Sequence, residues 1–182
     1  NYGSIKKVLD ELKNNKKIEL QILTGGSANI DKYGSISKII KKDKFKINEE
    51  VFFFVDGDKP ITMVKTTALG MIETSTALEK LRPDIVLTVG DRYETMATVI
   101  ASSYMNIPVA HTMGGEVSGT IDESIRHAIT KFSHIHFPAT KKSKNNIINM
   151  GENKKNIFLV GCPRIDLVKE CLNKKIKNLN SE

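Results

Sequence analysis

Cysteine is scarce in this sequence, with Cys162 and Cys171 the only two among 182 residues. Two cysteines do not make a disulfide framework, so a reducing cytoplasm is the expected compartment. No apolar run approaches the roughly 18 residues that a membrane-spanning helix needs. The first residues also lack the order of charged, apolar and small residues that marks a secretion signal. We therefore expect a cytoplasmic protein that does not enter a membrane.

The motifs of several common cofactor sites are also missing. Neither a Walker loop nor a complete Gly-x-Gly-x-x-Gly fingerprint is present, so ATP and NAD have no support. The four histidines lack the spacing of zinc ligands, so we propose no metal. Cys162 precedes Pro163 without an obvious activating base, and we interpret this cysteine as structural.

Aromatic residues amount to 6%, and none is interleaved with the lysines to stack on bases. The formal net charge of +7 suggests nucleic acid at first, but the charge is unevenly distributed. Residues 141–182 carry ten Lys or Arg against four Asp or Glu, whereas residues 83–140 carry three against six. Lysines on the exposed faces of terminal helices are usually solvated. We therefore expect no nucleic-acid partner.

Helical and strand-like patterns alternate along the chain, which indicates βαβ units and a parallel sheet. The strand-like segments are short, rich in Val and Ile, and mostly not alternating, as expected when helices cover both faces of a sheet. The predicted fold class is α/β, a Rossmann-like parallel sheet with helices on both faces. We expect strands at residues 18–23, 51–55, 85–89, 107–111, 134–138 and 157–160. We expect helices near residues 5–12, 33–42, 60–80, 93–105, 121–132 and 141–150.

The start of the chain departs from this pattern. A doubly wound domain normally opens with a central strand, whereas this sequence begins in a turn and continues into a helix. We therefore expect the first strand to be missing. Residues 1–172 are assigned to an amino-terminal Rossmann-like domain that is truncated at its start. Residues 173–182 are assigned to a linker or tail towards an absent second domain.

Candidate catalytic groups follow the predicted strand at residues 85–89. Ligands of open parallel sheets bind beyond the carboxyl ends of the strands, and Gly90, Asp91, Arg92 and Glu94 stand there. Asp91 has two interpretations that spacing does not separate. It either caps the next helix together with Glu94, or it acts as a general base where a glycine lets a ligand approach closely.

The next predicted strand ends in His111 and is followed by Gly114, Gly115 and Glu116. A histidine within a strand is ordinarily a core residue, although His111 is also placed to contact a ligand. The glycine pair makes either a simple turn or a loop shaped around a ligand. We favour the loop because an acidic residue follows the pair.

The segment Thr120 to Glu123 has the pattern of a capping box, with Thr120 accepting from the first helical turn and Glu123 reaching back. Asp122 and Arg126 are four residues apart and share a face at the amino end of the helix. They form either an exposed ion pair or part of a cleft where the helix dipole attracts anions. The expected buried stripe consists of Ile121, Ile125, Ala128, Ile129 and Phe132.

Three segments together carry a specific signature. They are Gly-Asp-Arg-Tyr-Glu at 90–94, Gly-Gly-Glu-Val-Ser-Gly-Thr-Ile-Asp-Glu-Ser-Ile-Arg-His-Ala-Ile-Thr-Lys at 114–131, and Gly-Cys-Pro at 161–163. With these segments the chain resembles the hydrolysing UDP-N-acetylglucosamine 2-epimerases of sialic and legionaminic acid biosynthesis, over essentially its whole length. The resemblance implies the amino-terminal half of a glycosyltransferase-B-like fold.

The resemblance implies an elimination followed by addition of water. A base removes the C2 proton of the sugar, UDP leaves C1, and water adds to give N-acetylmannosamine, without a cofactor or metal. On this basis Asp91 and Asp122 match catalytic acid or base groups, and Arg92 and Arg126 match substrate or diphosphate contacts. The C2 proton is weakly acidic, so the base must act together with charge stabilisation of the departing diphosphate. The implied partners are a UDP-sugar and, at full length, further copies of the chain.

Met113 departs from the family, in which many members carry a carboxylate at this position. A thioether cannot transfer protons, so either Glu116 is the third catalytic group or the catalytic roles are divided differently among the acidic residues. The expected substrate-binding residues are Arg92, Glu94, His111, Gly114, Gly115, Ser118 and Arg126.

Other functions remain open from the sequence. The substrate is alternatively a related UDP-diacetamido sugar, or the reaction a non-hydrolysing 2-epimerisation. From another class, the chain is a non-catalytic remnant that binds nucleotide sugars; a nucleic-acid-binding module is the least favoured. We expect these 182 residues to be inactive alone, because the family's phosphate-binding arginine loop and its second domain are absent from the sequence.

Overall fold

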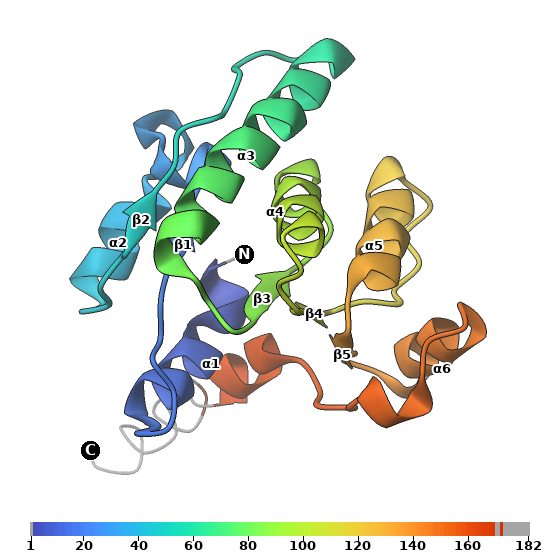
Figure 1. Cartoon of the computed structure of the whole chain (residues 1–182). Coiled ribbons are helices and arrows are strands. Elements are labelled where there is room, and N and C mark those ends of the chain that lie inside the picture. Colours follow the sequence, from blue (N-terminus) through green and yellow to red (C-terminus); the bar gives the residue numbers. More distant parts are fainter. Residues whose placement is uncertain (1, 170–171, 173–182) are drawn as a thin grey trace.

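A computed structural model describes residues 2–169 and residue 172, and Figure 1 shows their arrangement. The helices are α1 (Tyr2–Asn14), α2 (Ile36–Lys42), α3 (Pro60–Leu81), α4 (Tyr93–Tyr104), α5 (Ile121–Phe132) and α6 (Lys141–Asn149). The strands are β1 (Leu23–Thr24), β2 (Glu49–Glu50), β3 (Val86–Val89), β4 (Val109–Thr112) and β5 (Ile135–Phe137). Short 3-10 helices lie in the connections, at η1 (Gly26–Asn29), η2 (Asp31–Tyr33) and η3 (Lys154–Asn156). Residues 163–169 are also helical.

The strands pair in parallel, as the alternation of patterns predicts. β1 pairs with β2, and β3, β4 and β5 pair in that order. In the larger sheet Val86 lies opposite Val109, and Ala110 lies opposite Ile135. Within the described residues the strands thus form two sheets, β2-β1 and β3-β4-β5, rather than the single sheet that the sequence suggests.

Helices lie on both sides of the strands, which confirms the predicted fold class. In Figure 1, α3, α4 and α5 stand in a row on one side of β3, β4 and β5, and α1 lies on the other. Helix α3 packs closely against α4 at Gly70. A Cβ added to this glycine would lie only 2.9 Å from the Cβ of Ala97 in α4. No helix in the described part of the chain is both long and apolar enough to cross a membrane.

The core is made of separate apolar clusters on the faces of the strands. One joins α1 to the first sheet through Leu9, Ile22, Ile40 and Phe45. Another is formed by Val51, Phe53 and Ala77, and a third by Val99, Val109 and Ile129. The second sheet is therefore held to α4 and α5 by β-branched side chains that are wholly buried.

The expected strand at residues 18–23 is mostly wrong, because only Leu23 and Thr24 form a ladder. The backbone N–H of Ile22 donates to the side-chain oxygen of Asn48 at 3.0 Å, so a side chain takes the place of a strand partner. Ile18 is exposed. The strand therefore starts later than its apolar residues suggest.

The apolar run at residues 51–55 lies outside the assigned strand β2. Side chains again satisfy its backbone: Asn29 donates to the carbonyl of Val51 at 3.0 Å, and Thr66 accepts from the N–H of Val55 at 2.9 Å. The expected strand at 157–160 is reduced to one bridge, between His136 and Ile157. The expected helices are confirmed with shifted ends, and α3 begins at Pro60 as predicted. The expected tail at 173–182 lies outside the described residues.

Candidate active site

The candidate residues leave the sheet at one edge. Val89, Thr112 and Phe137 lie opposite one another at the ends of the parallel strands β3, β4 and β5. The segments that follow β3 and β4 therefore emerge side by side, one carrying Asp91 and the other carrying Glu116. We call this edge the rim, and it brings together the strand-end residues that the sequence analysis selected.

An ion pair between Asp91 and Arg126 joins two elements at the rim. Arg126 comes from the second turn of α5, and only 5% of this residue is exposed. Its guanidinium also donates to the carbonyl oxygen of Glu116 at 2.6 Å. A buried guanidinium needs such partners to replace its hydration. Arg126 thus links the end of β3, the loop after β4 and helix α5.

This arrangement corrects two expectations about α5. Asp122 does not pair with Arg126, and in the described structure its half-buried carboxylate has no hydrogen-bond or ion-pair partner. Ile121, expected in the buried stripe, is 63% exposed, whereas Ile129 is wholly buried. The helix is rotated so that Arg126 faces inward, because Asp91 offers it a partner there.

The capping box of α5 is also built differently from the prediction. Thr120 is the N-cap residue, but its side chain accepts no hydrogen bond from the first turn. The carboxylate of Glu123 instead accepts from the backbone N–H groups of Ser118 at 2.7 Å and Gly119 at 2.6 Å. These two donors lower the pKa of Glu123. Glu123 therefore fixes the exposed loop that carries Ser118, a predicted substrate contact.

The glycine pair in the loop after β4 packs closely against neighbouring parts of the protein. A Cβ on Gly114 would lie 3.0 Å from the ring of His111. Gly115 has a φ of +78°, and a Cβ there would lie 2.3 Å from the carbonyl oxygen of Ser143 in α6. Both glycines are buried. The fold therefore requires both glycines, and their contact with a substrate stays a prediction.

His111 is wholly buried, so the structure places it beneath the rim rather than on it. Its Nε2 donates to the carbonyl of Gly90 at 2.9 Å, and Nδ1 has no hydrogen-bond partner in the described part of the chain. Burial lowers the pKa of His111 to about 4, which keeps the ring neutral at physiological pH. The neutral ring of His111 holds Gly90, the residue before Asp91. This contact is a positioning role instead of the predicted substrate contact.

Arg92 and Glu94 form an ion pair at the start of α4, with 3.0 Å between Nε and Oε2. The guanidinium also lies over the ring of Tyr93, 5.3 Å from its centroid. Arg92 is the N-cap residue of α4, and no side chain caps the helix. The alternative interpretation of Asp91 as the cap is therefore wrong. Its carboxylate pairs with Arg126 instead.

Gly25 and Gly26 were not among the site residues predicted from the sequence. They follow β1, and a Cβ built on Gly26 would lie 3.1 Å from Cγ of Glu94. The end of the first sheet thus reaches the rim as well. Its signal in the sequence is a glycine pair directly after a strand, the same pattern that follows β4.

Glu116 extends the acidic character of the rim. Its carbonyl is held by Arg126, while in the described residues its carboxylate has no partner. Met113, three residues earlier, has a φ of +62°, a left-handed conformation that non-glycine residues adopt rarely. Two hollows of about 380 and 230 Å³ in the described part of the chain are lined by residues of other segments. Among the described residues no cluster of His, Cys, Asp or Glu is suited to hold a metal ion.

Comparison with known proteins gives consistent matches. The family described as UDP-N-acetylglucosamine 2-epimerase matches residues 10–182. A UDP-N,N'-diacetylbacillosamine 2-epimerase (hydrolyzing) from Legionella pneumophila is 40% identical over 91% of this chain and 44% of its own length. A GDP/UDP-N,N'-diacetylbacillosamine 2-epimerase (hydrolyzing) from Campylobacter jejuni is 35% identical over 94% of this chain and 45% of its own length. The chain thus spans less than half the length of these relatives.

Among solved structures, the UDP-GlcNAc 2-epimerase from Neisseria meningitidis, crystallised with UDP-GlcNAc, superposes with a TM-score of 0.81. The match covers 98% of this chain and 49% of that one, at 22% sequence identity. At this identity the likeness shows the fold, which is glycosyltransferase-B-like in these neighbours.

Proposed function

Because the chain belongs to the UDP-N-acetylglucosamine 2-epimerase family, we propose that it forms the acid and base side of a hydrolysing UDP-sugar 2-epimerase. The observation that carries the proposal is the Asp91 carboxylate, which Arg126 holds at the carboxyl end of β3. Two further acidic residues belong to the segments that Arg126 joins to it. Glu116 is tied to the same arginine through its carbonyl, and Asp122 lies one helical turn before Arg126 on α5.

The proposed reaction needs two proton transfers and a leaving group. A carboxylate takes the proton from C2 of the sugar while UDP leaves C1 with the bonding electrons, which creates a double bond between C1 and C2. The oxygen of a water molecule then bonds to C1. C2 receives a proton on the face opposite to the one from which its proton was removed, which inverts C2. Asp91 is the proposed base, with Glu116 and Asp122 as the groups that return the proton and activate water.

Arg126 serves as a positioning residue in this proposal. Its guanidinium is occupied by Asp91 and by the carbonyl of Glu116, so it orients the acidic groups rather than the diphosphate. Arg92 is more exposed, and only the neighbouring Glu94 pairs with it in the described structure. Arg92 is therefore the proposed diphosphate contact at this edge, where it would counter the charge on the departing UDP.

The names of the relatives support a 2-acetamido sugar as substrate. The two relatives that are 40% and 35% identical are named for diacetylbacillosamine. A relative from Neisseria meningitidis, 30% identical, is named for UDP-N-acetylglucosamine. Both sugars carry the same acetamido group at C2, so the elimination is chemically the same. The higher identities favour the diacetamido sugar, and UDP-N-acetylglucosamine is the second candidate.

The test uses a protein of the relatives' length that carries these residues, supplied with each nucleotide sugar in deuterated water. We expect release of UDP together with a free 2-epimer that carries deuterium at C2. The Asp91→Asn variant should lower the rate of UDP release by about 10² to 10⁴-fold, while Glu79→Gln, on an exposed face of α3, should not. An epimerised sugar still linked to UDP would contradict the hydrolysing reaction.

The 182-residue chain is proposed to be inactive alone. The chain spans less than half the length of the relatives it matches, and a nucleotide sugar needs contacts that exclude water and stabilise the leaving group. Incubation of the purified chain with either nucleotide sugar should release no UDP. Calorimetric titration with UDP separates a chain that still binds the nucleotide from one that requires further residues for binding.

A further inference from the structure

Glu152 holds two side chains at the edge of the sheet where the strands begin. It follows α6, in the connection that leads to the bridge between Ile157 and His136 of β5. Its Oε1 lies 2.5 Å from Nζ of Lys131, in the last turn of α5, and its Oε2 lies 3.4 Å from Nε2 of His136. The side chain of Glu152 is only 14% exposed. Three segments thus meet at one carboxylate, on the edge of the sheet opposite the rim.

Helix α5 connects this carboxylate to the rim. Lys131 follows Arg126 on the helix at a distance of about 7.5 Å along its axis, and Arg126 pairs with Asp91 at the rim. Between these two basic residues, Ile129 and Thr130 are wholly buried. A helix that is held by an ion pair at each of two points cannot slide or turn without breaking one of them. The position of Arg126, and of the Asp91 carboxylate that it holds, therefore depends on the contact of Lys131.

The strands provide a second connection. His136 of β5 lies opposite His111 of β4 in the parallel ladder, so the two rings stand on the same face of the sheet. Both rings are buried. The Nε2 of His111 donates to the carbonyl of Gly90 at 2.9 Å, and Gly90 precedes Asp91. Glu152 is thus connected to the segment of Asp91 through two neighbouring histidines as well as through α5.

The acceptors determine which nitrogen of each ring carries the proton. A carboxylate and a carbonyl only accept hydrogen bonds, so Nε2 is the protonated nitrogen in both His136 and His111. Nδ1 of either ring has no hydrogen-bond partner in the described part of the chain. Burial lowers the pKa of His136, although the charge of Glu152 acts in the opposite direction. Each ring is therefore neutral at physiological pH, and the contact that orients the ring of His136 is the one with Glu152.

We propose that Glu152 is a positioning residue for the acidic rim. From the opposite edge of the sheet it holds α5 through Lys131 and β5 through His136, and both contacts lead to Asp91. This role rests on the proposed function, in which Asp91 is the base. A base must stay in place relative to the C2 proton, because small displacements of reacting groups reduce the rate strongly. Loss of the Glu152 carboxylate should therefore lower kcat and leave KM largely unchanged, since Glu152 itself lies away from the rim.

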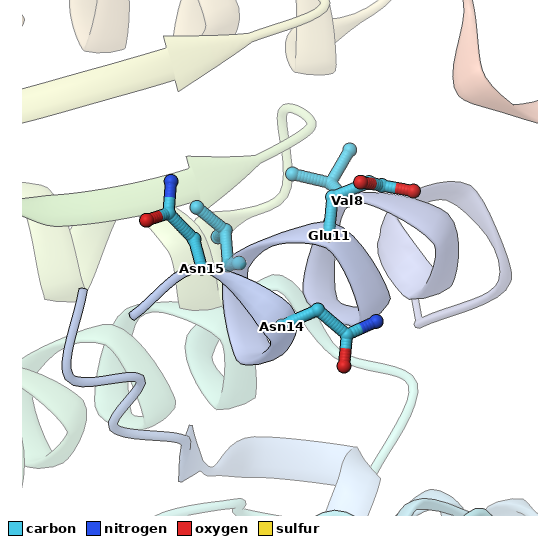
Figure 2. Close-up of a pocket in the computed structure, with 5 residues that line it drawn as sticks. Val8, Glu11, Asn14 and Asn15 are labelled. Carbon is cyan, nitrogen blue, oxygen red and sulfur yellow. The ribbon is translucent and has the colours of Figure 1, made fainter. Parts of the chain in front are cut away.

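The test compares Glu152→Gln and Lys131→Met with two control variants. Glu152→Gln keeps the shape of the side chain but removes its charge, and Lys131→Met removes only the contact with α5, at a lysine whose side chain is 55% exposed. Glu49→Gln is the matched control, because it breaks an ion pair between β2 and α3. Glu11→Gln removes an exposed carboxylate of α1, beside the hollow that Figure 2 shows. Neither control belongs to a segment that Glu152 joins.

Solvent exchange of side-chain protons, followed by NMR of the purified chain, reports on both connections. We expect Glu152→Gln to accelerate exchange of the Arg126 guanidinium protons and of the His111 Nε2 proton. This acceleration should exceed that of the Val99 amide in α4 at least about 10-fold. Lys131→Met should accelerate exchange at Arg126 and leave the His111 proton nearly unchanged, because the connection through the strands remains. The two controls should change neither signal.

Unchanged exchange at Arg126 and His111 in the Glu152→Gln variant would overturn the proposal. An equal acceleration at Val99 would also overturn it, because Glu152 would then act only on the stability of the whole fold. Both outcomes are read from the chain without substrate, so they do not depend on catalysis.

The second measurement uses a protein of the relatives' length that carries these residues. Glu152→Gln should lower the kcat for UDP release about 10-fold or more with little change in KM, and Glu49→Gln should change neither. An unchanged kcat, or an increase in KM alone, would overturn the proposal as long as Asp91→Asn is impaired. If Asp91→Asn releases UDP at the normal rate, the proposed function fails instead, and proton exchange alone decides whether Glu152 holds the rim in place.

Discussion

Arg126 of α5 reaches the carboxylate of Asp91 at the end of β3, across 35 positions of the sequence. The same guanidinium holds the carbonyl of Glu116. One buried cation therefore sets the relative positions of a strand end, a loop and a helix start. The geometry of the proposed acidic site depends on this arginine more than on any contact between neighbouring residues.

Replacing Arg126 by methionine should therefore destabilise the chain strongly. The change removes one partner of a largely buried pair and leaves Asp91 unpaired, which costs about 3 to 5 kcal/mol. Urea denaturation of the purified chain measures the loss. Arg126→Lys should recover part of it, because a lysine keeps the charge but not the fork of donors.

Arg92→Met is the matched control, since Arg92, which pairs with Glu94 at the start of α4, is itself exposed. Pairs of this kind contribute up to about 1 kcal/mol. Equal losses for the variants at Arg126 and Arg92 would show that the buried pair has no special role in stability.

Gly115→Ala should also destabilise the chain. Gly119→Ala is the matched control, because it introduces the same backbone strain without a steric overlap. Both glycines have a similar positive φ, +78° and +73°, but only at Gly115 would a Cβ meet the backbone of α6. Alanine in this conformation costs about 1 to 2 kcal/mol at either site. The overlap with Ser143 should add roughly 1 to 3 kcal/mol at Gly115 alone. Thermal or urea unfolding of the two variants gives the difference, and a difference near zero would contradict the close packing of the loop on α6.

The sequence allowed the strand-end residues to be located, because parallel strands deliver their following segments to one edge. Asp91 and Glu116 were found in this way, and the structure places both at the rim. The paired strands β3, β4 and β5 were predicted to within two residues at each end. Local patterns were sufficient here because each of these strands is followed by its own helix.

Long-range partners were not visible in local patterns. A charged residue at helix spacing from Asp122 is ordinarily an exposed neighbour, so Arg126 was assigned to a polar face. Its burial depends on Asp91, which no periodicity links to it. The run at residues 51–55 failed as a strand for the same reason, since Asn29 and Thr66 supply its hydrogen bonds from elsewhere in the sequence.

Glu123→Gln should loosen the loop before α5. The carboxylate accepts from the amides of Ser118 and Gly119, and a neutral amide oxygen is a weaker acceptor. We expect faster hydrogen exchange at these two amides than in the unchanged chain, with no change at Ile129. Glu79→Gln on α3 is the control, because among the described residues Glu79 forms an ion pair only with the exposed Arg82. Unchanged exchange at Ser118 and Gly119 would show that the loop is held by other contacts.

The pH dependence of Glu123 follows from the same two donors. They lower its pKa in the folded chain below the ordinary glutamate value of 4.5. The ionised form therefore adds stability above about pH 4.5, and this contribution is lost as the pH falls through the lower, folded value. A carboxylate titration followed by NMR should place the midpoint of the Glu123 signal below pH 4.5. A titration of Glu123 at or above pH 4.5 would mean that the two amides do not donate to it in solution.

Acid should destabilise the fold through His111. Burial lowers its pKa from 6.5 to about 4, so the folded chain keeps the ring neutral where the unfolded chain already binds a proton. Stability is therefore complete above about pH 6.5, decreases as the pH falls towards 4, and levels off for this residue below that value. The full effect is about 3 kcal/mol. His111→Gln keeps a donor for the carbonyl of Gly90 but does not titrate, so urea midpoints should depend less on pH in this window. His134→Gln, at an exposed histidine, should retain the original slope. An identical slope in both variants would assign the acid sensitivity to other groups, with His136 the first to examine because burial lowers its pKa as well.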